Sequence, residues 1–292
     1  MKRVVSAVTI ALLTVSTWAL AGDRPTTIEE FYDPGAGMRI IAHRGFSGRA
    51  PENTLAAIRE AIGVGAEMAE IDVTLSSDGE IVVIHDETLQ RTTDGFGPVA
   101  EHTLRELKDL DAGSWFSPRF AGEPIPTLEE VLAVVKGRIL LNIEIKSEAV
   151  ERDIAARVVE TVQRLEMRDQ VVISSFAPTA LEQVRDLSPN FVTAVLYKPE
   201  FHKGLDAVDI VEDLGASAFN IKRQRLTSTM LKRCGENGVP VGIYTVNKKR
   251  HMRRMIRKGV AAIFTDYPDR GIEVLTKHAS PAPQLEPVPA GP

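Results

Sequence analysis

Three acidic residues on neighbouring predicted strands could hold a metal ion. Glu70 and Asp72 alternate with apolar residues in one strand, and Glu144 does so in the next. Alternate residues of a strand share a face, so the side chains of Glu70 and Asp72 should point the same way. Buried charges need partners, which a metal ion with a bound anion would supply.

The ligand types indicate which metal. Glu70, Asp72 and Glu144 offer hard carboxylate oxygens, and the sequence has no His–Cys cluster of the kind that binds zinc. We therefore expect one divalent cation, Mg²⁺ or Ca²⁺. The alternative is three solvated surface acids.

Two histidines end predicted strands, His43 in His43-Arg44-Gly45 and His85 in His85-Asp86. Barrel enzymes keep their catalytic groups at the C-terminal ends of strands. An imidazole titrates near neutral pH, so the two can share the work of general base and general acid. A single strand histidine is more often an ordinary core or surface residue, but a pair beside three acids is not well explained that way.

Other side chains could bind a substrate. Arg44 and Lys146 carry fixed positive charge where phosphate oxygens would lie, although each could instead pair with an acid such as Glu52 or Glu144. Phe176 and Tyr244 are candidates for lining the pocket, or for plain packing. Asn53, which precedes a predicted helix, is expected to cap it, with phosphate contact as the alternative.

Short β-branched runs alternate with amphipathic stretches along most of the chain, which is typical of repeated βα units. The predicted helices occupy 54–62, 128–135, 149–165, 178–187, 205–214, 228–236 and 249–258, with a closing helix near 271–277. The predicted strands occupy 39–42, 68–73 with a ribbon at 81–85, 139–145, 171–174, 192–196, 218–221, 241–245 and 261–265. Eight strands favour a TIM (β/α)8 barrel over an open doubly wound sheet.

The remaining segments flank or interrupt the barrel, which we place at 38–279. Residues 22–37 form a predicted N-terminal arm, and the Pro-rich residues 280–292 a disordered tail. The stretch 88–126 is rich in Gly and Pro, and we expect a short insertion that caps the barrel mouth.

Residues 1–21 have the basic, apolar and small-residue zones of a secretory signal peptide. We expect cleavage after Ala21 and an exported protein, periplasmic or secreted. The alternative is an uncleaved N-terminal anchor.

The formal net charge is −5, and loss of Lys2 and Arg3 with the signal peptide would make it −7. An acidic chain is a poor electrostatic partner for nucleic acid or an anionic membrane, so we expect neither as a stable partner. The sequence leaves the oligomeric state open.

An ordered set of motifs between Arg39 and Asp269 resembles the glycerophosphodiester phosphodiesterase family, in particular its compact bacterial members. Separate motifs such as His-Asp are weak, but the ordered set is specific. It consists of His43-Arg44-Gly45, Pro51-Glu52-Asn53-Thr54, Glu70-x-Asp72-Val73, Asp78-Gly79, His85-Asp86, Leu89-x-Arg91-Thr92-Thr93, Pro126-Thr127-Leu128-x-Glu130-Val131-Leu132, Glu144-Ile145-Lys146, Ser175-Phe176 and Thr265-Asp266-Tyr267-Pro268.

The resemblance implies a TIM barrel, a divalent cation held by Glu70, Asp72 and Glu144, and acid/base roles for His43 and His85. The implied products are an alcohol and sn-glycerol 3-phosphate, formed through a cyclic phosphate after attack by the glycerol 2-hydroxyl. It leaves open which histidine is the acid, with a preference for His85. Tyr244 departs from the Trp that the family commonly has, so the fit of the substrate could differ.

Two other functions fit the same motifs. One is a lysophospholipase D or a phosphoinositide-type phospholipase, which would need an exposed apolar rim; Trp115, Phe116 and Phe120 are the clearest candidates and are few. The other is a noncatalytic phosphodiester-binding protein that kept the barrel. Every catalytic position is present, which favours the enzyme and a small-molecule glycerophosphodiester substrate.

Overall fold

The protein is described by a computed structural model, which covers residues 24–146, 149 and 153–279. The predicted signal peptide and the predicted tail lie outside the described residues. Among the residues covered, no helix is long and apolar enough to cross a membrane.

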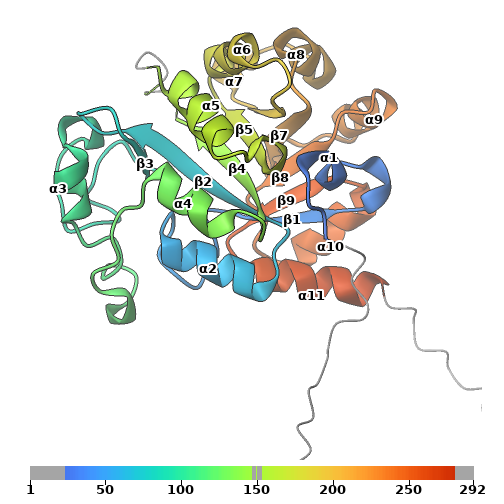
Figure 1. The fold of residues 1–292 in the computed structure, drawn as a ribbon. Coiled ribbons are helices and arrows are strands. Elements are labelled where there is room, and N and C mark those ends of the chain that lie inside the picture. The colour runs from blue at the N-terminus through green and yellow to red at the C-terminus, as the bar shows by residue number, and fades with distance from the viewer. Residues whose placement is uncertain (1–23, 147–148, 150–152, 280–292) are drawn as a thin grey trace, which may run out of the picture.

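Eight parallel strands of the described chain close into a barrel in the order β1, β2, β4, β5, β6, β7, β8, β9, with β9 pairing again with β1. The additional strand β3 pairs antiparallel with β2. The predicted TIM barrel is therefore confirmed (Figure 1). The strand bounds are β1 Arg39–Ala42, β2 Met68–Leu75, β3 Ile81–Val83, β4 Leu140–Ile145, β5 Val171–Ser175, β6 Thr193–Leu196, β7 Ala218–Lys222, β8 Val241–Tyr244 and β9 Ala262–Thr265.

Helices cover the outside of the barrel, and their ends follow the local sequence. Thr54 and Thr127 accept hydrogen bonds as N-caps, and Gly65 and Gly259 end helices in the left-handed conformation that glycine adopts readily. The main helices are α2 Leu55–Val64, α4 Leu128–Val135, α5 Ile154–Arg164, α6 Pro178–Leu187, α8 Ala207–Leu214, α9 Ser228–Glu236, α10 Lys249–Lys258 and α11 Pro268–Ala279.

Some predicted bounds were wrong. The helix predicted at 205–214 begins at Ala207, after the short helix α7 Pro199–His202. The start of the helix predicted at 149–165 falls partly outside the described residues, and α5 begins at Ile154. The ribbon predicted to end at His85 ends at Val83, because β3 leaves β2 there and His85 lies in the bend that follows.

The N-terminal segment contains a helix that the sequence pattern did not show. Thr27 and Glu30 form a capping box for α1 Ile28–Phe31. The buried side chains of Ile28 and Phe31 pack with Met68 and other inward-facing residues of the strands. This segment therefore contributes apolar packing to the interior of the barrel.

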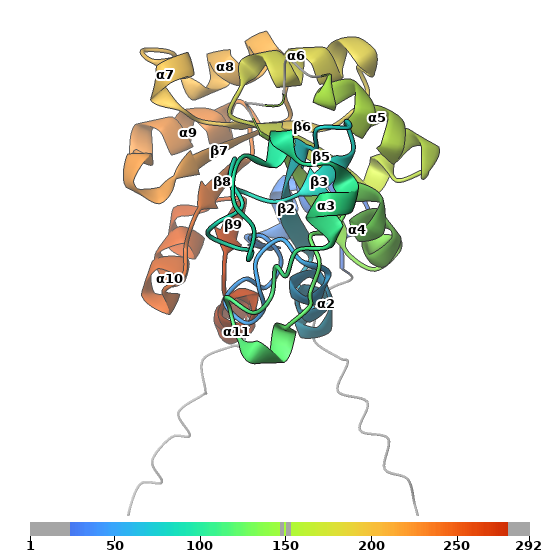
Figure 2. The ribbon, with the colours of Figure 1, turned by 90° about the vertical axis from the view of Figure 1, so that its left-hand side faces the viewer.

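The segment between β3 and α4 builds a small apolar cluster of its own. Leu89, Leu107 and Ile125 are buried in it, and Leu107 belongs to the short helix α3 Leu104–Lys108. Viewed toward the C-terminal ends of the strands, this segment crosses in front of the barrel (Figure 2). It therefore lies beside the mouth where the predicted site residues gather.

Candidate active site

The three predicted metal ligands meet at the barrel mouth. Asp72 and Glu144 are register partners in the β2–β4 pair, and Glu70 precedes Asp72 on the same face of β2. Ligand oxygens of the three carboxylates lie within 4.8 Å of one another. Glu70 and Asp72 are buried, and the side chain of Glu144 is 13% exposed. The arrangement can hold one cation.

Three carboxylates so close together cannot all keep their charge easily. Burial, followed by the charge of Asp72, raises the pKa of Glu70 to about 8 and that of Glu144 to about 7. Burial alone would raise the pKa of Asp72, but Lys146 and Arg44 hold it below its ordinary value. The trio therefore lacks positive charge, and a divalent cation would supply it.

Both predicted phosphate-binding cations lie against these acids. Lys146 Nζ is 3.0 Å from Glu144 Oε1 and 3.6 Å from Asp72 Oδ1. Arg44 Nη1 donates to Glu52 Oε1 at 2.7 Å, and the backbone N–H of Arg44 donates to Glu70 Oε2 at 2.7 Å. The structure thus shows the ion pairs that were the alternative to phosphate binding.

Asn53 does not cap the following helix, so that prediction was wrong: the capping side chain is Thr54. Asn53 Nδ2 instead donates to Asp72 Oδ2 at 2.8 Å, and its Oδ1 accepts from the Asp72 backbone N–H at 3.1 Å. Asn53 has a φ of 59°, a left-handed conformation that Asn tolerates better than most residues. It therefore fixes the orientation of one carboxylate of the predicted metal site.

Each histidine is oriented through its Nδ1 by a carboxylate. His43 Nδ1 lies 2.7 Å from Asp266 Oδ1, and Asn247 Nδ2 donates to the other oxygen of Asp266 at 2.6 Å. His85 Nδ1 lies 2.6 Å from Asp86 Oδ1. A carboxylate at Nδ1 selects the tautomer that leaves Nε2 for chemistry.

The surroundings shift the pKa values of the two imidazoles in opposite directions. Burial alone would lower the pKa of His43, but the hydrogen bond to Asp266 and the charge of Glu70 outweigh it, and its pKa is raised. Burial lowers the pKa of His85, with Lys146 acting in the same direction. Separated pKa values are what an acid/base pair requires.

Arg91, from the segment between β3 and α4, ties the two sides of the site together. Its guanidinium donates to both oxygens of Glu52, at 2.9 and 2.7 Å, and to both oxygens of Asp86, one of them at 3.0 Å. Glu52 in turn holds Arg44, and Asp86 holds His85. One side chain thus braces both a predicted phosphate ligand and a predicted catalytic histidine.

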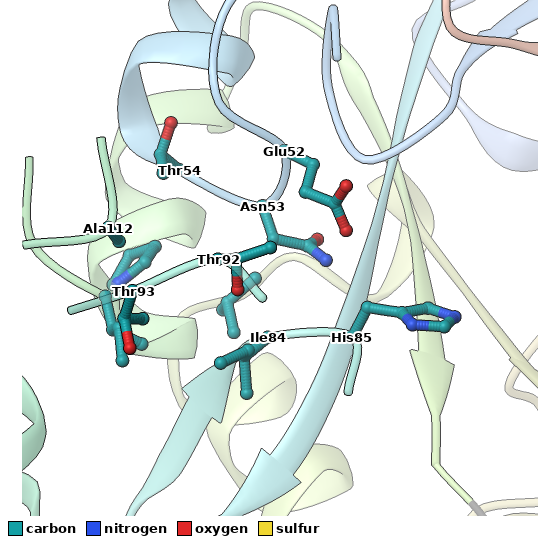
Figure 3. Close-up of a pocket in the computed structure, with 11 residues that line it drawn as sticks. Glu52, Asn53, Thr54, Ile84, His85, Thr92, Thr93 and Ala112 are labelled. Carbon is teal, nitrogen blue, oxygen red and sulfur yellow. The ribbon is translucent and has the colours of Figure 1, made fainter. Parts of the chain in front are cut away.

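A small pocket lies between the start of α2 and this segment, and His85 and Glu52 are among the residues that line it. Figure 3 shows the carboxylate of Glu52, the amide of Asn53 and the ring of His85 pointing to the same side. Thr92 and Thr93 line the opposite part. The pocket adjoins the site through His85.

The two aromatic residues predicted either to line the pocket or to pack, Phe176 and Tyr244, lie on the β5 and β8 side of the mouth. The rings of Phe176 and Tyr244 meet edge to face with centroids 6.0 Å apart. Tyr244 also donates its hydroxyl to the Tyr197 carbonyl at 3.1 Å. Both rings are half-buried, so each exposes part of its surface at the mouth.

Sequence reasoning assigned no role to several residues of the site: Asp86, Arg91, Asn247 and Asp266. It named Glu52 only as an acid that could pair with a cation of the site. All but Asn247 lie within the motifs that carry the family resemblance, which was the available signal. Some of their partners lie far away in the chain, as with His43 and Asp266, 223 positions apart, whereas Asp86 directly follows its partner His85. Spacing alone could not pair the distant ones.

Comparison with known proteins agrees with this geometry. The profile of the Glycerophosphoryl diester phosphodiesterase family matches residues 43–270. A glycerophosphodiester phosphodiesterase of Caldanaerobacter subterraneus subsp. tengcongensis is 40% identical over 244 residues, which cover 82% of this chain and 98% of the relative. One of Bacillus altitudinis is 36% identical over 239 residues, covering 81% and 97%.

A solved structure is also similar. It is a phosphodiesterase of Oleispira antarctica in complex with the product sn-glycerol-3-phosphate, with a TM-score of 0.76 and 33% identity over 83% of this chain and 98% of that one. The match of the family profile spans every predicted metal ligand and both histidines. The chain therefore belongs to the glycerophosphodiester phosphodiesterase family, a family of enzymes.

Proposed function

We propose that this enzyme hydrolyses soluble glycerophosphodiesters to sn-glycerol 3-phosphate and an alcohol. The observation that carries the proposal is the buried trio of carboxylates flanked by two carboxylate-bound histidines at the barrel mouth. The similar Oleispira antarctica phosphodiesterase is described with sn-glycerol-3-phosphate as its product, which supports the same product here.

Glu70, Asp72 and Glu144 would hold one divalent cation, Mg²⁺ or Ca²⁺. The fit rests on their oxygen ligands, their 4.8 Å grouping and the raised pKa values of Glu70 and Glu144, which mark a deficit of positive charge. The bound cation would neutralise phosphate oxygens as charge develops on them.

Arg44 and Lys146 would bind the phosphate of the substrate. Both already point at the acidic trio, so an anion bound beside the trio would come within their reach. A guanidinium and an ammonium there would stabilise the extra charge of the transition state. Phe176 and Tyr244 would contact the glycerol or the alcohol portion.

His43 and His85 would divide the proton transfers. One imidazole accepts the proton of the glycerol 2-hydroxyl as it attacks phosphorus, and the other protonates the leaving alcohol. Their roles exchange when water opens the cyclic phosphate. The family resemblance favours His85 as the acid, whereas the pKa directions above favour His43 as the protonated ring. A cation bound by Glu70 would cancel the part of the His43 pKa shift that comes from the charge of Glu70. Experiments with substrates that differ in their leaving group therefore assign the acid.

Turnover of a substrate panel tests the function. Purified protein is incubated with glycerophosphodiesters and lysophospholipids, with Mg²⁺ or Ca²⁺ in turn. Phosphorus NMR follows the cyclic phosphate, and an enzymatic assay identifies sn-glycerol 3-phosphate. Cleavage of lysophospholipids alone would favour the lysophospholipase D alternative, and binding without turnover would favour the noncatalytic one.

We also propose that the enzyme is exported and processed after Ala21. The proposal rests on the three zones of residues 1–21. N-terminal sequencing of the protein from its native cells should begin at Gly22, in a periplasmic or secreted fraction. A membrane-bound chain that keeps Met1 would show an anchor instead.

A further inference from the structure

Charge is distributed very unevenly along this chain. Residues 215–265 contain 12 Lys or Arg residues and a single acid, Glu236. The rest of the chain has 23 Lys or Arg residues against 39 Asp or Glu residues. The net charge of −5 therefore conceals one strongly basic sector, and an argument from net charge cannot exclude an anionic partner for it.

The basic sector is continuous in the fold. It comprises β7, α9, β8 and α10, and β7 and β8 are neighbours in the barrel. Lys258 on α10 donates to Ser228 on α9 at 3.3 Å, and both residues line a hollow between the two helices. Figure 2 shows α9 and α10 on the same flank of the barrel.

The segment after β7 joins this flank at the mouth. The pKa of His251 on α10 is lowered by desolvation and then by the positive charges around it. Those charges are Arg223, Arg250, Lys248 and Arg254. Arg223 follows β7, and the other three belong to α10 or its N-cap.

Most of these cations pair with no acid among the residues that the structure describes. Lys232, Arg233 and Lys249 form ion pairs with carboxylates. The other nine lie within ion-pair distance of no carboxylate in the part of the chain that the structure describes. We call these nine the basic face: Lys222, Arg223, Arg225, Lys248, Arg250, Arg253, Arg254, Arg257 and Lys258.

Helix α10 shows the pattern most clearly. Only Met252 and Met255 are buried in it, while Arg253, Arg254 and Arg257 are exposed. Like charges three and four residues apart repel one another, and no acid of the helix relieves them. An extended anionic surface would relieve this repulsion.

We propose that the basic face docks the enzyme on an anionic phospholipid bilayer. The choice of a bilayer rests on the proposed function, because glycerophosphodiesters are what remains of phospholipids after deacylation. Exposed apolar side chains next to the sector favour it as well: Phe201 on α7 is 46% exposed and Leu205 is 53% exposed. Lys198 Nζ lies 5.3 Å above the Phe201 ring. Cations beside apolar side chains suit the bilayer interface.

Docking would keep the active site close to its source of substrate. Lys222 ends β7, and Arg223 and Arg225 follow it at the C-terminal end of the barrel. Arg225 is close enough to Tyr244 to influence its pKa. The basic face therefore extends from the mouth, beside Tyr244, along the flank formed by α10.

Vesicle co-sedimentation of the mature enzyme tests this inference. The vesicles contain phosphatidylcholine alone or with about 30% phosphatidylglycerol, which provides the anionic surface. We expect binding only to the anionic vesicles, and its loss at about 0.5 M salt because exposed charges are then screened.

Charge reversal identifies the face. The triple variant Arg253→Glu, Arg254→Glu and Arg257→Glu should bind anionic vesicles at least about 125-fold more weakly, since each of the three basic residues near the surface strengthens binding roughly fivefold. A matched variant reverses three exposed arginines outside the sector: Arg59→Glu, Arg105→Glu and Arg138→Glu. It should stay within about twofold of wild type, because the field decays within a Debye length.

Turnover of soluble glycerophosphocholine should be the same in both variants as in the wild type, which shows that they are folded. Binding is measured without turnover, so failure of the proposed function would not be mistaken for failure of docking. Equal binding to neutral vesicles, or equal weakening by both triple variants, would overturn the inference. If the enzyme does not bind vesicles, two other results would also overturn the inference. One is binding to single-stranded DNA, and the other is self-association that the Arg253, Arg254 and Arg257 variant loses.

Discussion

Replacing Glu144 by Gln should make the metal-free enzyme more stable and the active enzyme much slower. The change keeps the shape of the side chain but removes one of three clustered negative charges. In the folded, metal-free protein burial and Asp72 raise the pKa of Glu144 to about 7, from its ordinary value of 4.5.

The size and sign of the stability effect follow from that pKa. Below pH 4.5 the carboxyl is neutral in both the folded and the unfolded chain. Between pH 4.5 and about 7 the folded chain keeps a proton that the unfolded chain has lost, so stability falls as pH rises. At about 1.4 kcal/mol per pH unit, the free energy of unfolding falls by roughly 3 kcal/mol over this range. Glu70 titrates in the same cluster, so part of this loss belongs to Glu70. Glutamine cannot ionise and escapes this loss.

Thermal unfolding in EDTA from pH 5 to pH 8 measures the effect. The variant should match the wild type at pH 5 and unfold about 5–10 °C higher at pH 8. Saturating cation should stabilise the wild type more than the variant, because the variant has lost a ligand. Exposed Glu160→Gln is the control and should show no pH-dependent difference.

Activity supplies the second half of the prediction. At saturating cation the Glu144→Gln enzyme should turn over at least about 100-fold more slowly, because charge stabilisation in the transition state is lost. Turnover near the wild-type rate would make Glu144 a structural residue. A variant less stable than wild type at pH 8 in EDTA would refute the electrostatic reasoning.

Three further predictions concern the same site. EDTA should abolish turnover and Mg²⁺ or Ca²⁺ should restore it; undiminished activity after exhaustive chelation would contradict the metal assignment. His43→Ala and His85→Ala should each lower turnover by about 10²–10⁴-fold, and p-nitrophenyl diesters should rescue only the variant that lacks the general acid. Wild-type rates in both would end the two-histidine mechanism. Arg91→Lys should lower kcat by about 10–100-fold, because an ammonium cannot grip both Glu52 and Asp86; unchanged kcat would mean that this brace is dispensable.

The barrel itself was predictable from local patterns. Short β-branched runs alternate with amphipathic stretches along the chain, which predicts repeated βα units. Within β2, the two-residue period of a strand placed Glu70 and Asp72 on one face. Their meeting with Glu144 also followed, because neighbouring parallel strands bring their C-terminal ends to one edge. These inferences needed only the chain direction and the period of a strand.

Other contacts were decided by how the closed barrel brings distant segments together. Asn is a common residue type at helix N-caps, but the left-handed backbone of Asn53 turns its amide toward Asp72. Thr54 therefore caps α2. The pairing of His43 with Asp266 depends on β9 closing against β1.

The sequence by itself determined the strands, the inward acids and the family motifs, because each depends on spacing along a single stretch of chain. The tertiary structure decided which distant carboxylate pairs with which residue of the candidate site, as Asp266 does with His43 and Glu52 with Arg91. It also decided that the cations of β7, α9 and α10 lie together on one flank. Electrostatic and hydrogen-bonding energies depend on distance in space, and the barrel sets those distances only when it closes.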